Sequence, residues 1–172
     1  KFPLLPFYAY NCVKYLMDTD EEIWKILKYN DPDCLNKPNL TKAEKTSLIY
    51  KGEPDESTFK VFFAEGEINA FNQESSILRI FLYSIFPENR TVSTITLAFD
   101  MFSHFRTQHL SDYSTRTERM SQIIFKTFNG EQIPEVGQMF FDILGNKEAR
   151  DYPQGQIPFK GKRALLSFKN GG

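Results

Sequence analysis

Two neighbouring segments near the middle of the chain constrain its fold most, because together they have the pattern of a long β-hairpin. Residues 77–86 (ILRIFLYSIF) are almost continuously apolar, as is typical of a strand covered on both faces or lying at an interface. Residues 92–105 alternate between an apolar and a polar face, which predicts one long, half-buried strand. Residues 86–90 (FPENR) have the length of a hairpin connection. The predicted apolar face carries Ile95, Leu97, Phe99, Met101 and Phe105, and the polar face carries Thr94, Thr96, Asp100 and His104.

Four helices are expected around this hairpin. The first covers residues 7–17, and the starts of the other three are marked by capping boxes. In a capping box, a threonine oxygen and a glutamate satisfy backbone N–H groups that the first helical turn leaves without partners. Gly130 is in the position of a C-terminal cap for the fourth helix, which is predicted over residues 114–129. The three capping boxes lie at residues 19–22, 41–44 and 115–118.

The order of the predicted elements indicates the fold class. Three further strands are expected, at residues 58–64, 139–144 and 164–168. The chain is therefore predicted to be a single α+β domain over residues 1–172, with an antiparallel or mixed β-sheet packed by a helix. Within it, we expect a helical N-terminal extension over residues 1–52, an α+β core over residues 57–172 and an exposed loop over residues 145–163.

Composition excludes several classes of function. Twenty-one basic against 22 acidic residues give a net charge of −1, so no global positive field attracts nucleic acid. Two cysteines and two histidines are too few for a disulfide scaffold or a structural zinc site, and no cofactor is predicted. No apolar segment is long enough for a membrane span, and no signal peptide is visible. The 17 Phe, 8 Tyr and 1 Trp indicate either burial against other subunits or a Phe-rich core.

The segment QHLSDYSTRTERM, residues 108–120, combines residue types used for proton transfer and phosphate binding. His109 and Asp112, with Asp100 and His104 upstream, are candidates for a metal-dependent nuclease site. However, Asp100 and His104 would lie about 13 Å apart on one face of a strand, too far to bind one ion. No phosphate-binding loop or nucleophile motif occurs. We therefore predict no catalytic or metal-binding residues and a protein that is not an enzyme.

Three segments resemble neck proteins of tailed bacteriophages, of the tail-terminator or tail-completion type. They are residues 23–53 (IWKILKYNDPDCLNKPNLTKAEKTSLIYKGE), 99–113 (FDMFSHFRTQHLSDY) and 113–142 (YSTRTERMSQIIFKTFNGEQIPEVGQMFFD). The resemblance implies a small α+β subunit that forms a homo-oligomeric ring, a hexamer or dodecamer, between the portal and head-closure proteins and the tail. It also implies location in the virion neck, with assembly in the host cytoplasm, and passage of genomic DNA without sequence-specific binding.

The resemblance further implies where a ring would make contacts. Residues 106–112 would lie near a ring edge. The N-terminal fifty residues and the loop at 145–162 depart from the simplest form of the family, and both segments could grip a neighbouring ring. A head-closure or portal adaptor protein, a small metal-dependent nuclease and a regulatory binding module remain alternatives. The candidate interface or lumen residues are Phe81, Tyr83, Arg106, His109, Arg116 and Arg119.

Overall fold

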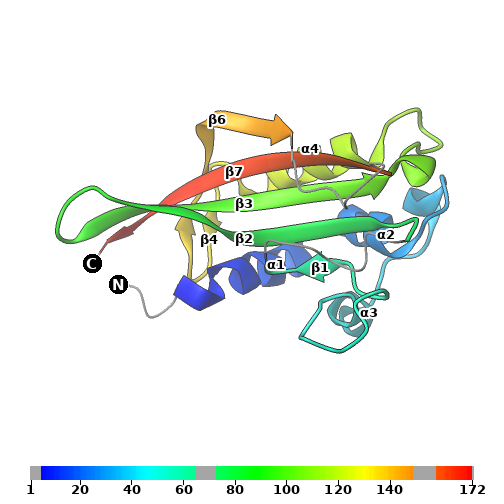
Figure 1. Cartoon of the computed structure of the whole chain (residues 1–172), viewed down its shortest axis with the longest axis horizontal. Helices are drawn as coiled ribbons and strands as arrows, with labels where there is room; N and C mark the ends of the chain where they lie inside the picture. Colours follow the sequence, from blue (N-terminus) through cyan, green and yellow to red (C-terminus); the bar gives the residue numbers. More distant parts are fainter. Residues whose placement is uncertain (1–4, 65–72, 149–157, 172) are drawn as a thin grey trace.

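A five-stranded mixed sheet forms the centre of the protein (Figure 1). The computed structural model describes residues 5–64, 73–148 and 158–171. The strand order is β1-β2-β3-β7-β6; β1 runs parallel to β2, and every other neighbouring pair is antiparallel. The predicted α+β class with a mixed sheet is confirmed. The strands are β1 (Val61–Phe62), β2 (Ser76–Pro87), β3 (Val92–His104), β6 (Phe140–Glu148) and β7 (Phe159–Gly171), and a separate two-stranded sheet consists of β4 (Gln132–Ile133) and β5 (Gly137–Gln138).

The helices pack on the sheet and enclose the main hydrophobic core with it. α4 contacts β3 and β7, while α1 and α2 contact β2. Figure 1 shows α1, α2 and α4 along the length of the sheet and α3 near one end of it. No helix in the described part of the chain combines the length and the hydropathy needed to cross a membrane. The helices are α1 (Tyr8–Thr19), α2 (Glu22–Lys28), α3 (Lys42–Ser47) and α4 (Arg116–Phe128), with 3-10 turns η1 (Leu5–Phe7), η2 (Cys34–Asn36) and η4 (Phe105–Thr107).

The N-terminal helices are part of the main core and do not stand apart as an extension. Cys12 and Leu16 of α1 and Ile23 and Trp24 of α2 are fully buried in the same cluster as the apolar side chains of β3. An apolar stripe on each helix covers sheet residues that would otherwise face water. The helices within the predicted N-terminal extension, residues 1–52, therefore pack on the sheet, and the buried faces of α1 and α2 are not free to grip a neighbouring ring.

Two of the three predicted capping boxes have the expected threonine cap. The hydroxyl oxygens of Thr41 and Thr115 accept from the backbone N–H three residues later, at 3.2 and 3.4 Å. The first box is wrong. Thr19 still belongs to α1 and its hydroxyl donates to a carbonyl one turn earlier, whereas the Asp20 carboxylate accepts from the N–H of Ile23 at 2.8 Å. An aspartate therefore caps the first turn of α2.

β3 is buried on both faces, which corrects the prediction of a half-buried strand. Every residue from Ile95 to Ser103 is buried. On the face away from the main core, Phe102 lies in a second apolar cluster with Phe62, Ile77 and Phe159. Phe105 was predicted on the apolar face but lies in η4 with 56% of its surface exposed, because the strand ends at His104.

The last two strands are longer than predicted, and they enter the region expected to be an exposed loop. β6 continues to Glu148 and β7 begins at Phe159, which is 1% exposed. Residues 149–157 of the predicted loop lie outside the described residues. β7 is an interior strand of the sheet, between β3 and the edge strand β6. Conversely, the strand predicted at residues 58–64 is reduced to the two residues of β1.

Candidate functional site

Arg116, the most prominent cation of the 108–120 segment, is buried and holds three parts of the fold together. Its guanidinium donates to the carbonyl oxygens of Ile26 at 2.8 Å and Asp31 at 2.7 Å, and its Nε donates to the carbonyl of Thr107. Burial lowers the pKa of this guanidinium, and the nearby Cys34 thiol acts in the opposite direction. Because Arg116 is 0% exposed, it is not a surface residue for a ring or for DNA.

Arg119, one turn further along α4, is partly exposed and forms ion pairs with nearby carboxylates. Its guanidinium lies 2.6 Å from the carboxylate of Asp112 and 3.9 Å from that of Glu22. The Asp112 carboxylate also accepts from the backbone N–H and the hydroxyl of Ser114. These contacts fix the turn that precedes α4, so the sequence candidates Asp112 and Arg119 have local structural partners.

The Ser114 contacts are expected to govern the ionisation of Asp112. Hydrogen bonds from Ser114, and secondarily the charge of Arg119, lower the pKa of Asp112 below its ordinary value. We expect Ser114→Ala to raise this pKa, as measured by NMR titration of the carboxylate, whereas Ser111→Ala on the same turn should leave it unchanged. A pKa unmoved by Ser114→Ala would contradict the assignment. Because the folded pKa is depressed, the stabilising effect is present above the unfolded value and is lost as the pH falls through the folded pKa.

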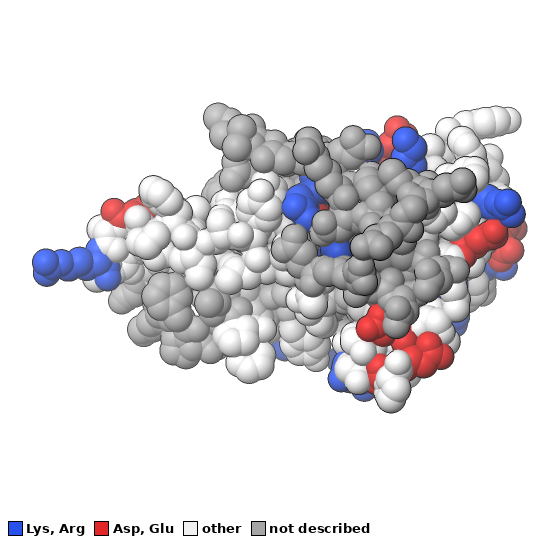
Figure 2. Space-filling view, viewed as in Figure 1, with Lys and Arg blue, Asp and Glu red and all other residues white. Residues whose placement is uncertain are grey.

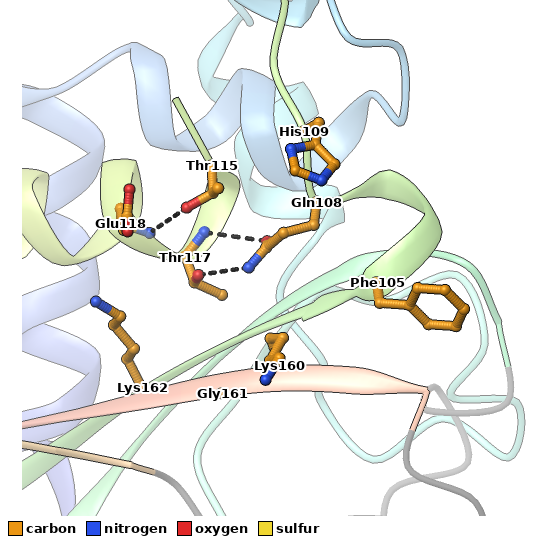
Figure 3. A pocket seen from close by; sticks show the side chains of 9 residues that line it. All are labelled: Phe105, Gln108, His109, Thr115, Thr117, Glu118, Lys160, Gly161 and Lys162. Atoms are coloured by element: carbon orange, nitrogen blue, oxygen red, sulfur yellow. Dashed lines mark hydrogen bonds between the residues drawn. The ribbon is translucent and has the colours of Figure 1, made fainter. Parts of the chain in front are cut away.

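His109 is exposed and borders a pocket of about 630 Å³ between the start of α4 and β7 (Figure 3). Gln108 closes one side of this pocket, because its amide donates to the Thr117 hydroxyl at 2.6 Å and accepts from the Thr117 N–H at 3.4 Å. Lys160 and Lys162 of β7 line another side, and Glu118 of α4 adds a carboxylate. A pocket with two ammonium groups and an imidazole can contact an anionic group, although Glu118 reduces the positive charge. Both lysines were predicted to lie in an exposed loop and not in a strand, so the sequence did not indicate that they and His109 line the same pocket.

Asp100, one of the two carboxylates of the candidate nuclease site, is buried in an ionic cluster. It lies between Arg79 of β2 and Arg163 of β7, which are its direct neighbours in the registers of the two strand pairs. The Arg79 guanidinium donates to Asp100 Oδ2 at 2.6 Å, and Arg163 Nε donates to Oδ1 at 2.7 Å. Among the described residues, no three His, Cys, Asp or Glu side chains converge as a metal site would require. A charged residue within the apolar run of β2 was the signal that could have predicted this buried cluster.

The second half of β2 exposes large apolar side chains, and we call this region, residues 82–87 with the turn that follows, the arm. In Figure 1 the hairpin of β2 and β3 extends at the left beyond the helices, and Figure 2 shows a mostly uncharged surface there with charges at its far end. Phe81 is buried at 6% exposure and stacks under the guanidinium of Arg163, so the exposed surface begins after it. The exposed fractions are 40% for Leu82, 44% for Tyr83, 37% for Ile85 and 67% for Phe86.

The protein is a small α+β domain with a sheet at its centre and exposed apolar side chains on one projecting strand segment, and contiguous exposed apolar surface of this kind commonly marks an interaction site. The YomW family model matches residues 20–156, and the chain belongs to the YomW family. This family is phage-derived, so the protein is phage-associated. A comparison with curated proteins gives no match.

Proposed function

We propose that this protein is a structural component of the virion that forms a ring in the phage neck, completes or terminates the tail and joins it to the head. The exposed apolar arm is the observation that carries the proposal. The phage-derived family and the sequence resemblance to tail-terminator and tail-completion proteins support it. The protein works through assembly and not through catalysis, as a hexamer or dodecamer.

The arm can supply a substantial part of the free energy of association. Full burial of one large apolar side chain contributes about 1.5–3 kcal/mol. The four exposed side chains of the arm retain between 37% and 67% of their surface, so their burial would contribute roughly 3–6 kcal/mol before the entropic cost of association. In the proposed ring the arm would meet a different surface of the next copy, because head-to-tail contacts are the kind that generate rings.

The opposite end of the sheet carries the remaining exposed cations of the candidate set. His109 is exposed beside Lys160 and Lys162, and Arg106 is exposed with a weak contact of 3.4 Å to Glu74. We assign this end to contacts with passing DNA or with the adjoining ring, without sequence-specific binding. A net charge of −1 for the whole chain is compatible with DNA that slides without being held. Tyr83 belongs to the arm, whereas Arg116 and Phe81 are too buried for either role.

A head-closure or portal adaptor protein is the second candidate of the same class, and its ring would bind the portal directly. Binding of the purified protein to portal rings and to tails, each tested alone, separates the two. The nuclease alternative finds little support, because the carboxylates of Asp100 and Asp112 both form ion pairs with arginine side chains.

Substitution of Phe86 tests the role of the arm. Phe86→Ser should weaken self-association by about tenfold or more, because each 1.4 kcal/mol lost is a tenfold change, and it should leave the unfolding temperature of the dilute monomer unchanged. Phe105→Ser is the matched control, since Phe105 is similarly exposed but lies at the other end of the sheet. Molar mass as a function of concentration, from light scattering or sedimentation, measures both. A wild-type chain that stays monomeric at every concentration would rule out the ring.

A further inference from the structure

The edge of the sheet along the second half of β2 is open. β1 pairs with β2 only at Leu78 and Arg79, and no other strand in the described part of the chain lies on that side of β2. An open edge presents backbone N–H and C=O groups that can pair with another strand, and proteins usually protect such edges with charged side chains. Residues 82–87 (LYSIFP) contain no charged residue. Up to Phe86 this edge therefore lacks protective charges. Pro87, which has no backbone N–H, and the register irregularity between Leu82 and Ser84 are the features that limit pairing along it.

The opposite edge of the sheet is β6, which among the strands of the described residues pairs with β7 alone. Through the pairings across β7 and β3, Phe140 lies at the level of Ser84, and Glu148 lies at the level of Leu78. β6 thus lies at the level of the open part of β2 only at Phe140 and Phe141, opposite residues 82–84, whereas residues 146–148 lie at the level of residues 78–80. Phe140, at the start of β6, is 51% exposed.

The directions of the two edge strands are compatible with pairing between copies. β2, β3, β7 and β6 alternate in direction, so β2 and β6 are antiparallel to each other. If a second copy continues the sheet beside β6, its β2 lies antiparallel to β6 and the alternation is preserved. Antiparallel pairs are the more stable type per residue. A contact between two different edges also repeats around a ring, whereas a two-fold contact between two β2 edges closes as a dimer.

We infer that the open edge of β2 pairs with the outer edge of β6 in the next copy of this chain, so that one continuous sheet runs around the ring. The inference rests on the proposed ring and specifies its subunit contact. The apolar side chains of the arm then pack on the neighbouring subunit, while the backbone hydrogen bonds set the register between the two copies. The irregularity in the β2–β3 register between Leu82 and Ser84 increases the local twist where the sheet passes to the next subunit.

Hydrogen exchange followed by mass spectrometry tests this pairing, because it reports backbone hydrogen bonds directly. The full chain is compared at a concentration where it is assembled and after dilution to the monomer, with molar mass measured in parallel. We expect exchange of residues 82–87 and of β6 to slow by about tenfold or more on assembly, because exchange there then requires the subunits to separate. Residues 95–101 of β3, already paired on both sides, serve as the internal control and should not change.

The outcomes separate the inference from the proposed function. A ring mass without slower exchange in β6 would overturn the edge pairing and leave the ring proposal intact. Slower exchange in residues 82–87 alone, with a dimer mass, would indicate a two-fold contact and overturn both. A monomer at all concentrations would also overturn both.

Cross-linking provides a second test that depends on position. Ser84 and Phe140 are exposed and lie at the same level on opposite edges of the sheet, while the native Cys12 and Cys34 are buried and free. With a short bis-maleimide, the double variant Ser84→Cys and Phe140→Cys should give a ladder of multimers. Each single variant should remain monomeric on a denaturing gel. Dimers from Ser84→Cys alone, or no ladder from the double variant of an assembled ring, would contradict the pairing of β2 with β6.

Discussion

Replacement of Asp100 by alanine is expected to destabilise the protein by about 3–5 kcal/mol, because breaking a buried ion pair by removal of one partner has this cost. The carboxylate and the Arg79 side chain are both 0% exposed, and the Arg163 side chain is 15% exposed. Asp100→Ala would take the carboxylate away from two guanidinium groups held side by side in the sheet. Their mutual repulsion, which Asp100 now screens, would add to the loss of the hydrogen bonds.

Chemical unfolding measured by the fluorescence of the single, fully buried Trp24 gives this free energy. Asp112→Ala is the control, since it removes an exposed carboxylate that also pairs with an arginine, and it should cost far less than Asp100→Ala. Asp100→Asn keeps the shape of the side chain and should be intermediate if the alanine variant does not fold. A cost for Asp100→Ala similar to that of Asp112→Ala would refute a central role for this ionic cluster.

Arg116→Ala is expected to cost roughly 3 kcal/mol or more, because it leaves buried carbonyl oxygens without their charged donor. The guanidinium joins the loop after β3 to α2 and to the connection that follows α2, and these segments are far apart in the sequence. The loss should therefore also loosen the packing of α2 against α4. Hydrogen exchange in α2 should accelerate along with the fall in the free energy of unfolding.

Arg119→Ala is the matched control, on the same helix and only one turn away. Arg119 is partly exposed and makes ion pairs with Asp112 and Glu22, so its removal should cost about 1 kcal/mol or less. Arg116→Lys keeps the charge but lacks the planar fork of donors that reaches three carbonyls, and it should restore less than half of the lost stability. Equal effects of the two alanine substitutions would show that the hydrogen bonds of Arg116 to the three carbonyl groups do not stabilise the fold more than the ion pairs of Arg119 do.

The role of Arg116 could not be predicted from the sequence, for a physical reason. Local patterns locate helices and their caps, and the start of α4 at Thr115 was predicted from its capping box. Arg116 and Arg119 have similar local patterns, yet one is buried and the other is not. The difference arises because α2 and the connection after it supply the carbonyls of Ile26 and Asp31, some ninety residues earlier in the chain. No local pattern contains that information.

The burial of β2 could also not be predicted in full from its local sequence pattern. Its sequence was compatible with a strand covered on both faces and with one lying at an interface, and each interpretation fits one half of the strand. Residues 76–81 are buried, whereas residues 82–87 are exposed. Both halves are similarly apolar, so the boundary depends on where the covering elements end. The burial of β3 also depends on its neighbours and not on its own pattern, because its polar face, which includes Asp100, is buried.

The interior position of β7 in the sheet has a consequence for synthesis of the protein. β7 lies between β3 and β6, although it follows both of them in the chain. While the ribosome is making earlier residues, β3 and β6 have no strand to join them, and the hairpin of β2 and β3 lacks half of its partners. We expect the sheet to close only after residues 159–171 have emerged, in one late step that brings distant segments together. Chains that stop before Phe159 would then lack the completed sheet on which the proposed ring contact depends, and this would exclude incomplete chains from such a ring.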